Sequence, residues 1–170
     1  MNKKGFTLIE LLAVLVILSI IMGLAIPNVV STLDKSKKEG YITDAKKFLA
    51  LVKTEISNKI NKPARGEIVR INLECVDNQD LTKDPDGNLY SEKDSFVVIV
   101  RKDDKLVYYI NLVGQNQNDK NKNRGIRLTE SSLLEDDDRY KYIDKNFTTP
   151  TEIDIRTITG VSGRIRTCSN

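Results

Sequence analysis

The residue of this chain with the clearest potential for chemistry is Glu10, a single carboxylate directly before a run of apolar residues. Glu10 is followed by residues 11–26, in which Ser19 is the only polar side chain, and the run ends at Pro27. An ionised carboxylate held in an apolar helix within a membrane costs about 1 to 3 kcal/mol, so such a charge usually has a partner. This position therefore favours ion pairing, and a glutamate that merely reaches the lipid headgroups is the alternative.

The rest of the chain lacks the residue types and motifs that are typical of catalytic sites. The 170 residues include no histidine, which removes the commonest general base and the commonest metal ligand. The sequence also lacks a nucleophile elbow, a phosphate-cradling loop and a Cys/His pair. We therefore expect a protein that is not an enzyme and that uses no cofactor.

Two acidic stretches resemble metal sites only superficially. Residues 84–88, Asp-Pro-Asp-Gly-Asn, place glycine too early for a calcium loop, and no glutamate stands at the twelfth position. Their Pro and Gly instead favour a solvent-exposed turn. Residues 135–138, Glu-Asp-Asp-Asp, are better explained as a solvated acidic face. We expect neither stretch to hold a metal.

Residues 6–26 are long enough to cross a bilayer, which takes about 20 apolar residues. Lys3 and Lys4 precede them and place the start of the segment on the cytoplasmic side, so that the rest faces outward. A secretory signal peptide would have its cleavage site after the apolar stretch, whereas a Gly-Phe junction lies before it here. A simple membrane anchor remains an alternative explanation. The net charge of +3 includes these two lysines and favours no specific nucleic-acid partner.

Beyond Pro27 the sequence predicts a helix that is apolar along one face only. Its apolar residues recur at spacings of three and four, with charged side chains mostly on the other faces. These apolar residues are Tyr41, Ala45, Phe48, Leu49, Val52, Ile56 and Ile60. The run Asn61-Lys62-Pro63 signals the end of the helix. One side of this helix is therefore expected to pack against a globular domain.

The residues after Pro63 have the pattern of strands and turns. Residues 69–75 alternate apolar and polar side chains, as a strand with one buried face does. Residues 95–101 and 106–113 are rich in β-branched residues, and the Lys-Asp-Asp-Lys between them predicts a hairpin. A long helix followed by an antiparallel sheet is an α+β layout.

The last third of the chain is harder to assign. Residues 114–125 are polar almost throughout, which predicts an exposed, mobile loop. Residues 128–143 fit a short helix or a loop equally. Residues 152–159 alternate isoleucine with polar residues, which predicts a final strand.

Residues 5–12, Gly-Phe-Thr-Leu-Ile-Glu-Leu-Leu, closely resemble the processing and methylation motif of type IV prepilins and of the related type II secretion and competence pseudopilins. The resemblance is specific over residues 3–27. It implies that a prepilin peptidase cuts between Gly5 and Phe6 and that the new amino terminus at Phe6 is N-methylated. It also implies that Glu10 pairs with the Phe6 amine of a neighbouring subunit during assembly, and that Pro27 kinks the helix.

The resemblance implies the pilin fold, a long N-terminal α-helix with a hydrophobic first half, packed on a C-terminal antiparallel β-sheet head. The implied parts are a leader peptide at 1–5, a hydrophobic transmembrane and filament-core helix at 6–27, an amphipathic helix at 28–62 and a β-sheet globular head at 63–170. The implied function is a structural subunit, the major pilin, of a type IV pilus that serves motility, adhesion or biofilm formation.

The family also implies the surroundings of the chain. Its partners would be identical subunits in a helical filament, the prepilin peptidase and methylase, a pilus assembly platform and minor pilins. The protein would lie in the cytoplasmic membrane as a single-pass subunit with its head outside before assembly, and in a surface pilus afterwards.

A pseudopilin of a type II secretion or competence (DNA-uptake) system is the alternative. Residues 84–90 resemble the Asp-Pro-x-Gly-Asn-x-Tyr turn of major pseudopilins, with Leu89 in place of the usual proline. An anchored external domain that never polymerises is a third possibility.

The two cysteines, Cys75 and Cys168, leave two outcomes open. Many type IV pilins of Gram-negative bacteria close a C-terminal loop with a disulfide, but their two cysteines usually both lie in the second half of the chain. A bridge here would tether the carboxyl end outside the cell. Because Cys75 falls on the apolar face of its predicted strand, a buried free thiol is the other outcome.

Overall fold

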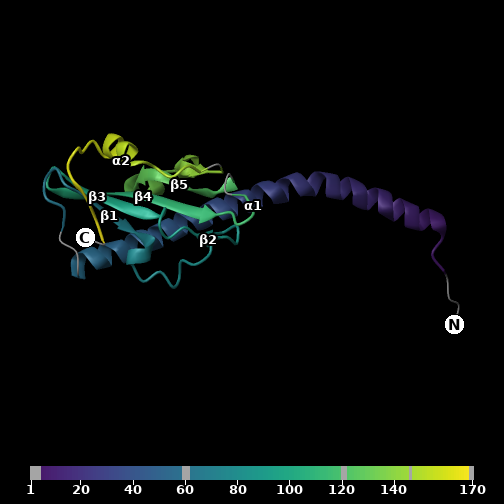
Figure 1. Cartoon of the computed structure of the whole chain (residues 1–170). Helices are drawn as coiled ribbons and strands as arrows, with labels where there is room; N and C mark the ends of the chain where they lie inside the picture. The colour runs from purple at the N-terminus through teal and green to yellow at the C-terminus, as the bar shows by residue number, and fades with distance from the viewer. Residues whose placement is uncertain (1–4, 59–61, 120–121, 146, 169–170) are drawn as a thin grey trace. The chain divides into compact units, whose positions relative to one another are not determined.

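The computed structural model describes residues 5–58, 62–119, 122–145 and 147–168. Lys3 and Lys4, which are predicted to set the orientation in the membrane, lie outside these ranges. The chain divides into two compact units, Met1–Ser36 and Lys37–Asn170. Helix α1, Leu8–Asn58, contributes its first half to the first unit and its second half to the second (Figure 1). The predicted α+β architecture, a long N-terminal helix followed by a mostly antiparallel sheet, is confirmed.

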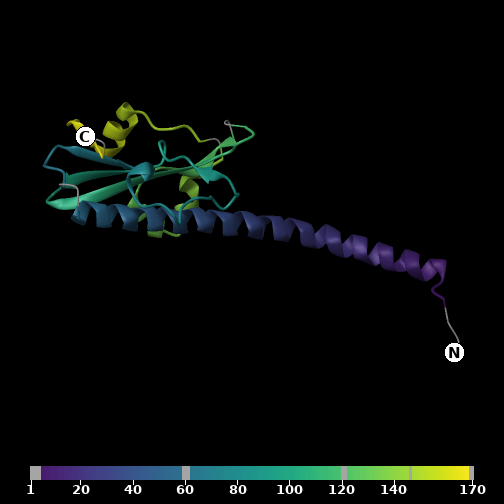
Figure 2. The same cartoon turned by 60° about the horizontal axis from the view of Figure 1, so that its bottom comes forward.

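The second unit is built on a seven-stranded sheet in the order β6-β5-β4-β3-β1-β7, with β2 paired to β4. Its strands are β1 (Ile68–Asn72), β2 (Leu89–Tyr90), β3 (Phe96–Lys102), β4 (Lys105–Gln115), β5 (Arg124–Glu130), β6 (Ile143–Asp144) and β7 (Ile165–Thr167). The pairs are antiparallel except for β1 and β7, which run parallel. Figure 2 shows α1 and α2 on opposite sides of this sheet.

The predicted hairpin is confirmed as β3 and β4, with Lys102 opposite Lys105. Asp103 and Asp104 both have left-handed φ angles, 45° and 61°, as the tight turn between twisted strands requires. The strand predicted at 69–75 is shorter than expected. It ends at Asn72, and a 3-10 turn, η1 (Leu73–Cys75), follows it.

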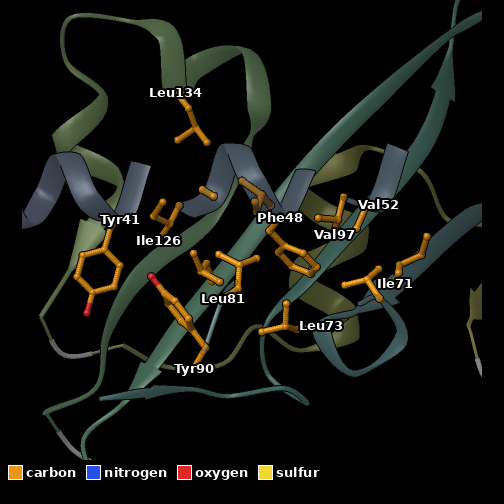
Figure 3. Packing of buried hydrophobic residues seen from close by; sticks show 14 of the residues in the cluster. Tyr41, Phe48, Val52, Ile71, Leu73, Leu81, Tyr90, Val97, Ile126 and Leu134 are labelled. Atoms are coloured by element: carbon orange, nitrogen blue, oxygen red, sulfur yellow. The ribbon is translucent and has the colours of Figure 1, made fainter. Parts of the chain in front are cut away.

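The second half of α1 packs on one face of the sheet and forms the larger core (Figure 3). The predicted helix stripe supplies Tyr41, Ala45, Phe48, Val52 and Ile56, all at most 5% exposed. Opposite strand residues alternate inward and outward, so only every second one meets the helix. Those on this face include Ile71, Val97, Ile99, Ile110, Leu112 and Ile126. Periodicity in the sequence therefore gives the packing face correctly.

A second core lies on the other face of the sheet, beneath α2 (Glu152–Thr159). Ile155 of this helix is fully buried against the alternate strand residues. These are Ile68, Phe96, Val98, Val100, Tyr109 and Leu128. Because both faces are covered, the central strands read as nearly continuous apolar runs.

The strand predicted at 152–159 is wrong, because these residues form α2. Thr151 caps the helix, since its hydroxyl oxygen accepts from Asp154 N–H while the Asp154 carboxylate accepts from Thr151 N–H. Gly160, at φ 68°, closes the other end in the left-handed conformation. Ile153 is 75% exposed, so the isoleucine alternation did not mark a buried strand face.

The loop predicted at 114–125 is also too long. Strand β4 continues to Gln115, and β5 already begins at Arg124. Gly125 is buried because it faces the Leu112 carbonyl, where an added Cβ would lie 2.1 Å from the oxygen. This close backbone approach requires glycine at position 125.

Residues 128–143 are neither a single helix nor a plain loop. They contain the end of β5, two 3-10 turns, η3 (Ser131–Glu135) and η4 (Arg139–Tyr142), and the start of β6. No strand was predicted after residue 160, yet β7 pairs with β1. A disulfide joins Cys75 to Cys168, with Cα atoms 6.3 Å apart, and so ties η1 to the residue that follows β7.

Candidate functional site

The start of α1 is capped by Thr7 and Glu10, which hydrogen-bond to each other in both directions. The Thr7 N–H and hydroxyl both donate to Glu10 Oε2, at 2.8 and 2.7 Å, and Glu10 N–H donates to the Thr7 hydroxyl oxygen at 3.3 Å. Two of the amide groups that a helix start leaves unpaired are thus satisfied. The carboxylate also lies at the positive end of the helix dipole.

This capping arrangement was not predicted, although the sequence carries its signature. Thr-x-x-Glu immediately before an apolar run is the usual pattern of a capping box. Thr7 is therefore a residue of the site that the sequence reasoning missed. Gly5 and Phe6 lie just before the helix, and both are exposed.

The first unit presents its apolar side chains outward on all sides. Every residue from Gly5 to Leu33 is exposed, including Phe6 at 86%. Helix α1 is the one helix in the described residues that is long and apolar enough to cross a membrane. Since nothing within the first unit covers this surface, it requires an apolar environment supplied by something else.

The apolar half of α1 passes through Pro27 without interruption. Proline has no N–H, so one backbone hydrogen bond to the preceding turn is missing there. Nearby polar side chains bond to the helix backbone instead of facing a polar partner. Asn28 donates to the Leu24 carbonyl at 3.2 Å, and Thr32 donates to the Asn28 carbonyl at 2.8 Å. The few polar groups of this surface are therefore largely satisfied internally.

A second feature lies in the second unit, at residues 84–88, which we call the Asp84 turn. Asp84 is only 4% exposed, so the prediction of a solvent-exposed turn is wrong for this residue. Its Oδ2 accepts the Tyr41 hydroxyl at 2.6 Å, and its Oδ1 accepts the N–H groups of Asp86 and Asn88 at 2.9 and 2.7 Å. A Cβ at Gly114 would lie 1.9 Å from Asp84 Oδ2, so glycine is required for this approach to β4.

The Asp84 turn also contacts the second half of α1 directly. An added Cβ at Gly40 would lie 2.6 Å from Pro85 Cγ, so the absence of a side chain there lets the proline pack against the helix. Lys37 Nζ lies 2.8 Å from Asp86 Oδ1. The turn therefore joins the helix to the sheet through packing, an ion pair and a buried hydrogen bond.

Two buried tyrosines complete this junction. The Tyr90 hydroxyl donates to Asp44 Oδ2 at 2.8 Å, and the rings of Tyr90 and Tyr41 meet edge to face, 6.3 Å apart. Burial raises the pKa of Tyr41 well above its ordinary value, and its hydrogen bond to Asp84 adds to this. Burial and the nearby Asp44 charge raise the pKa of Tyr90 in the same way. Both hydroxyls are held as donors.

The acidic stretch at 135–138 is exposed, as predicted. Glu135 pairs with Lys46 at 2.9 Å. Within the described ranges, no group of three or more His, Cys, Asp or Glu side chains is placed to hold a metal.

Comparisons with known proteins agree with the amino-terminal features. A family model described as the prokaryotic N-terminal methylation motif matches residues 1–26. A ComG operon protein 3 homolog from Bacillus licheniformis is 34% identical over 83 residues, which cover 44% of this chain and 84% of that protein. No solved structure matches the chain significantly. More than half of this chain thus lies outside that match.

Proposed function

The chain belongs to the type IV pilin and pseudopilin superfamily, and on that premise we propose that it is the major structural subunit of a type IV pilus. The prepilin motif implies processing by a prepilin peptidase and assembly with other pilins. In this proposal the peptidase cuts between Gly5 and Phe6, and Phe6 is then N-methylated. Motility, adhesion or biofilm formation would follow from the fibre.

The observation that carries the proposal is the uncovered apolar surface of residues 8–33. The Glu10 carboxylate, which caps the helix, lies at the start of this surface. Lipid covers this surface while the subunit waits in the cytoplasmic membrane. On polymerisation the flanks of neighbouring helices replace the lipid, and the Phe6 amine of one subunit supplies the partner that Glu10 requires in an apolar interior. The head, fixed to the second half of α1, is carried to the outside of the filament.

Replacing Glu10 tests this proposal. We expect Glu10→Ala to abolish filaments or to leave them few and irregular, because the amine and carboxylate no longer pair, while the subunit still accumulates in the membrane. Glu55→Ala, a matched change on the same helix, should leave filament number unchanged. The measurement is immunogold electron microscopy together with the amount of sheared protein. Normal filaments from Glu10→Ala would contradict the proposal.

A second candidate, a pseudopilin of a competence system, is favoured by the printed name of the relative, ComG operon protein 3 homolog. In that case the subunit forms a short filament for DNA uptake rather than a long fibre. Deleting the gene separates the two: loss of transformation with no visible labelled fibres in the parent cells favours the second candidate, and loss of long labelled fibres favours the first. The family consists of structural subunits, so neither candidate is an enzyme.

A further inference from the structure

A hollow of about 400 Å³ lies in the second unit, beside β2 and the end of β4. Its size is within the range of ordinary small-molecule sites. Three stretches that are separate in sequence line it: residues 73–82, residues 89–94 and the last residue of β4. We call this hollow the β2 pocket.

The floor of the β2 pocket belongs to the larger core. Leu73, Leu81 and Tyr90 are each at most 5% exposed and lie in the same cluster as the second half of α1 (Figure 3). Because close-packed core side chains rearrange little, this floor is fixed. Leu89, in contrast, is 46% exposed and offers an apolar surface that a ligand can cover.

One wall of the pocket is the turn between β2 and β3, which its own hydrogen bonds hold in shape. The Ser91 hydroxyl donates to Asp94 Oδ2 at 2.8 Å and accepts the Asp94 N–H at 3.2 Å. Ser91 N–H donates to the Val113 carbonyl at 2.7 Å, and the Lys93 carbonyl accepts Asn72 Nδ2 at 2.7 Å. Since this backbone is fixed before a ligand arrives, less entropy is lost on binding.

Several polar groups of the lining remain available to a ligand. Within the described part of the chain, the Lys93 ammonium, the Gln115 carboxamide and the Thr82 hydroxyl make no hydrogen bond or ion pair, and all three residues are exposed. The Glu92 carboxylate is also exposed, and its Oε1 accepts Asn78 Nδ2 at a long 3.4 Å. The set therefore combines an ammonium that only donates, a carboxylate that only accepts, and two groups that do both.

This combination indicates which chemical class of ligand the β2 pocket suits. An anion would meet the carboxylates of Glu92 and Asp94, and a cation would meet the Lys93 ammonium. A wholly apolar ligand would remove water from these groups without replacing its hydrogen bonds. A neutral ligand with several hydroxyl groups can donate to the carboxylates and accept from the ammonium at once.

We propose that the β2 pocket binds a neutral mono- or disaccharide. The hydroxyl groups of the sugar hydrogen-bond to Glu92, Lys93 and Gln115, and its C–H face covers Leu89. This site belongs to the head and does not depend on whether the subunit polymerises, so it stands or falls separately from the filament proposal.

A printed array of neutral, anionic and cationic mono- and disaccharides, probed with the full chain, tests this site. The chain is kept in a polyoxyethylene detergent, because detergents with sugar headgroups would compete. We expect the neutral saccharides to give the strongest signal, and calorimetric titration with the strongest of them gives the affinity.

Two matched double variants locate the binding. For Glu92→Ala/Gln115→Ala we expect a loss of affinity of about tenfold or more, because two hydrogen-bonding side chains are removed. Glu74→Ala/Gln79→Ala removes the same two residue types from exposed positions outside the pocket and should stay within about twofold of the parent.

Near-UV circular dichroism checks that each variant is folded, and Lys93→Ala/Gln115→Ala replaces the first double variant if that one is not. A parent that binds no neutral saccharide on the array, or that prefers the charged ones, would overturn the proposal. Equal losses in the pocket variant and the control variant would do the same. A loss confined to the pocket variant supports it.

Discussion

The two halves of helix α1 share one regular backbone but differ in what covers their side chains. Up to Ser36 no described residue is buried, whereas the second half buries Tyr41, Ile42, Ala45, Phe48, Val52 and Ile56. The second half satisfies its apolar face within the chain, against the sheet. The first half is apolar all round and finds no such cover in its own unit, so its environment must come from lipid or from other subunits.

The difference shows that helix formation and burial are separate problems in this protein. Capping by Thr7 and Glu10 fixes the start of the first half. In the second half Gly40 and the Asp84 turn add specific contacts that fix one face of the helix to the sheet. Substitutions in the second half of α1 should therefore change the stability of the head. Substitutions in the first half should change only assembly.

The largest expected contrast comes from shortening one apolar side chain in each half. Phe48→Ala leaves a cavity in the core and should lower the free energy of unfolding of the head by about 4 kcal/mol. Leu15→Ala, at a residue 56% exposed, should change it by less than about 0.5 kcal/mol. All six tyrosines lie beyond residue 36, so the tyrosine band of the near-UV circular dichroism spectrum follows the head alone during denaturation in detergent. Similar losses from both variants would break the comparison.

Removing the disulfide should weaken the second unit alone. Cys75 and Cys168 are 93 positions apart, and closing so long a loop stabilises a fold by about 4.6 kcal/mol in the chain-entropy model. Since removing a native bridge typically costs about 2 to 5 kcal/mol, we expect Cys75→Ser/Cys168→Ser to lose about 4 kcal/mol while the helical signal of the first half stays unchanged in detergent. Intact mass with and without reductant is the companion measurement, since a parent protein with two free thiols contradicts this account.

Alkaline pH should act on the second unit through Tyr41 and Tyr90. The pKa values of both tyrosines are raised in the folded state. Their contribution to the free energy of unfolding is therefore complete below 10.0, the pKa in the unfolded chain, and is lost as the pH rises above it. We expect the free energy of unfolding to fall by about 2 to 3 kcal/mol between pH 9 and 11. Tyr41→Phe/Tyr90→Phe should show a shallower fall over the same range, and an identical slope would refute the assignment.

A smaller effect is expected from the Asp84 turn. Asp84→Asn keeps the shape of the side chain but exchanges one carboxylate oxygen for a donor, which leaves either the Tyr41 hydroxyl or two backbone N–H groups poorly paired. The expected loss is about 2 kcal/mol. Asp80→Asn, outside the turn on an exposed residue, is the control. Equal stability of the two variants would show that the buried hydrogen bonds do not hold the helix to the sheet.

Much of this fold could be predicted because its signals are local and periodic. The apolar run, the helix stripe through Phe48 and the hairpin at Asp103 and Asp104 all follow from residue spacing. The misassigned α2 shows the limit of that approach. Its isoleucines alternate like a strand, and the signals that indicate a helix are the capping pair Thr151 and Asp154 at one end and Gly160 at the other.

The parts that could not be predicted depend on contacts between distant residues. Burial of Asp84 requires Tyr41 and Gly114, which come from a helix and a strand far away in sequence. The short parallel strand β7 has no pattern of its own and is specified by its pairing with β1 and by the bridge to Cys75. Single-sequence patterns do not contain such information.

Mass spectrometry of the amino terminus, on protein sheared from cells, tests the central claim most directly. If the apolar half of α1 passes from the membrane into a filament, the recovered chains should begin at Phe6, carry one N-methyl group and sediment as fibres. Chains that keep Met1 and stay monomeric in detergent would contradict the account, because an unprocessed subunit has no free Phe6 amine to meet Glu10.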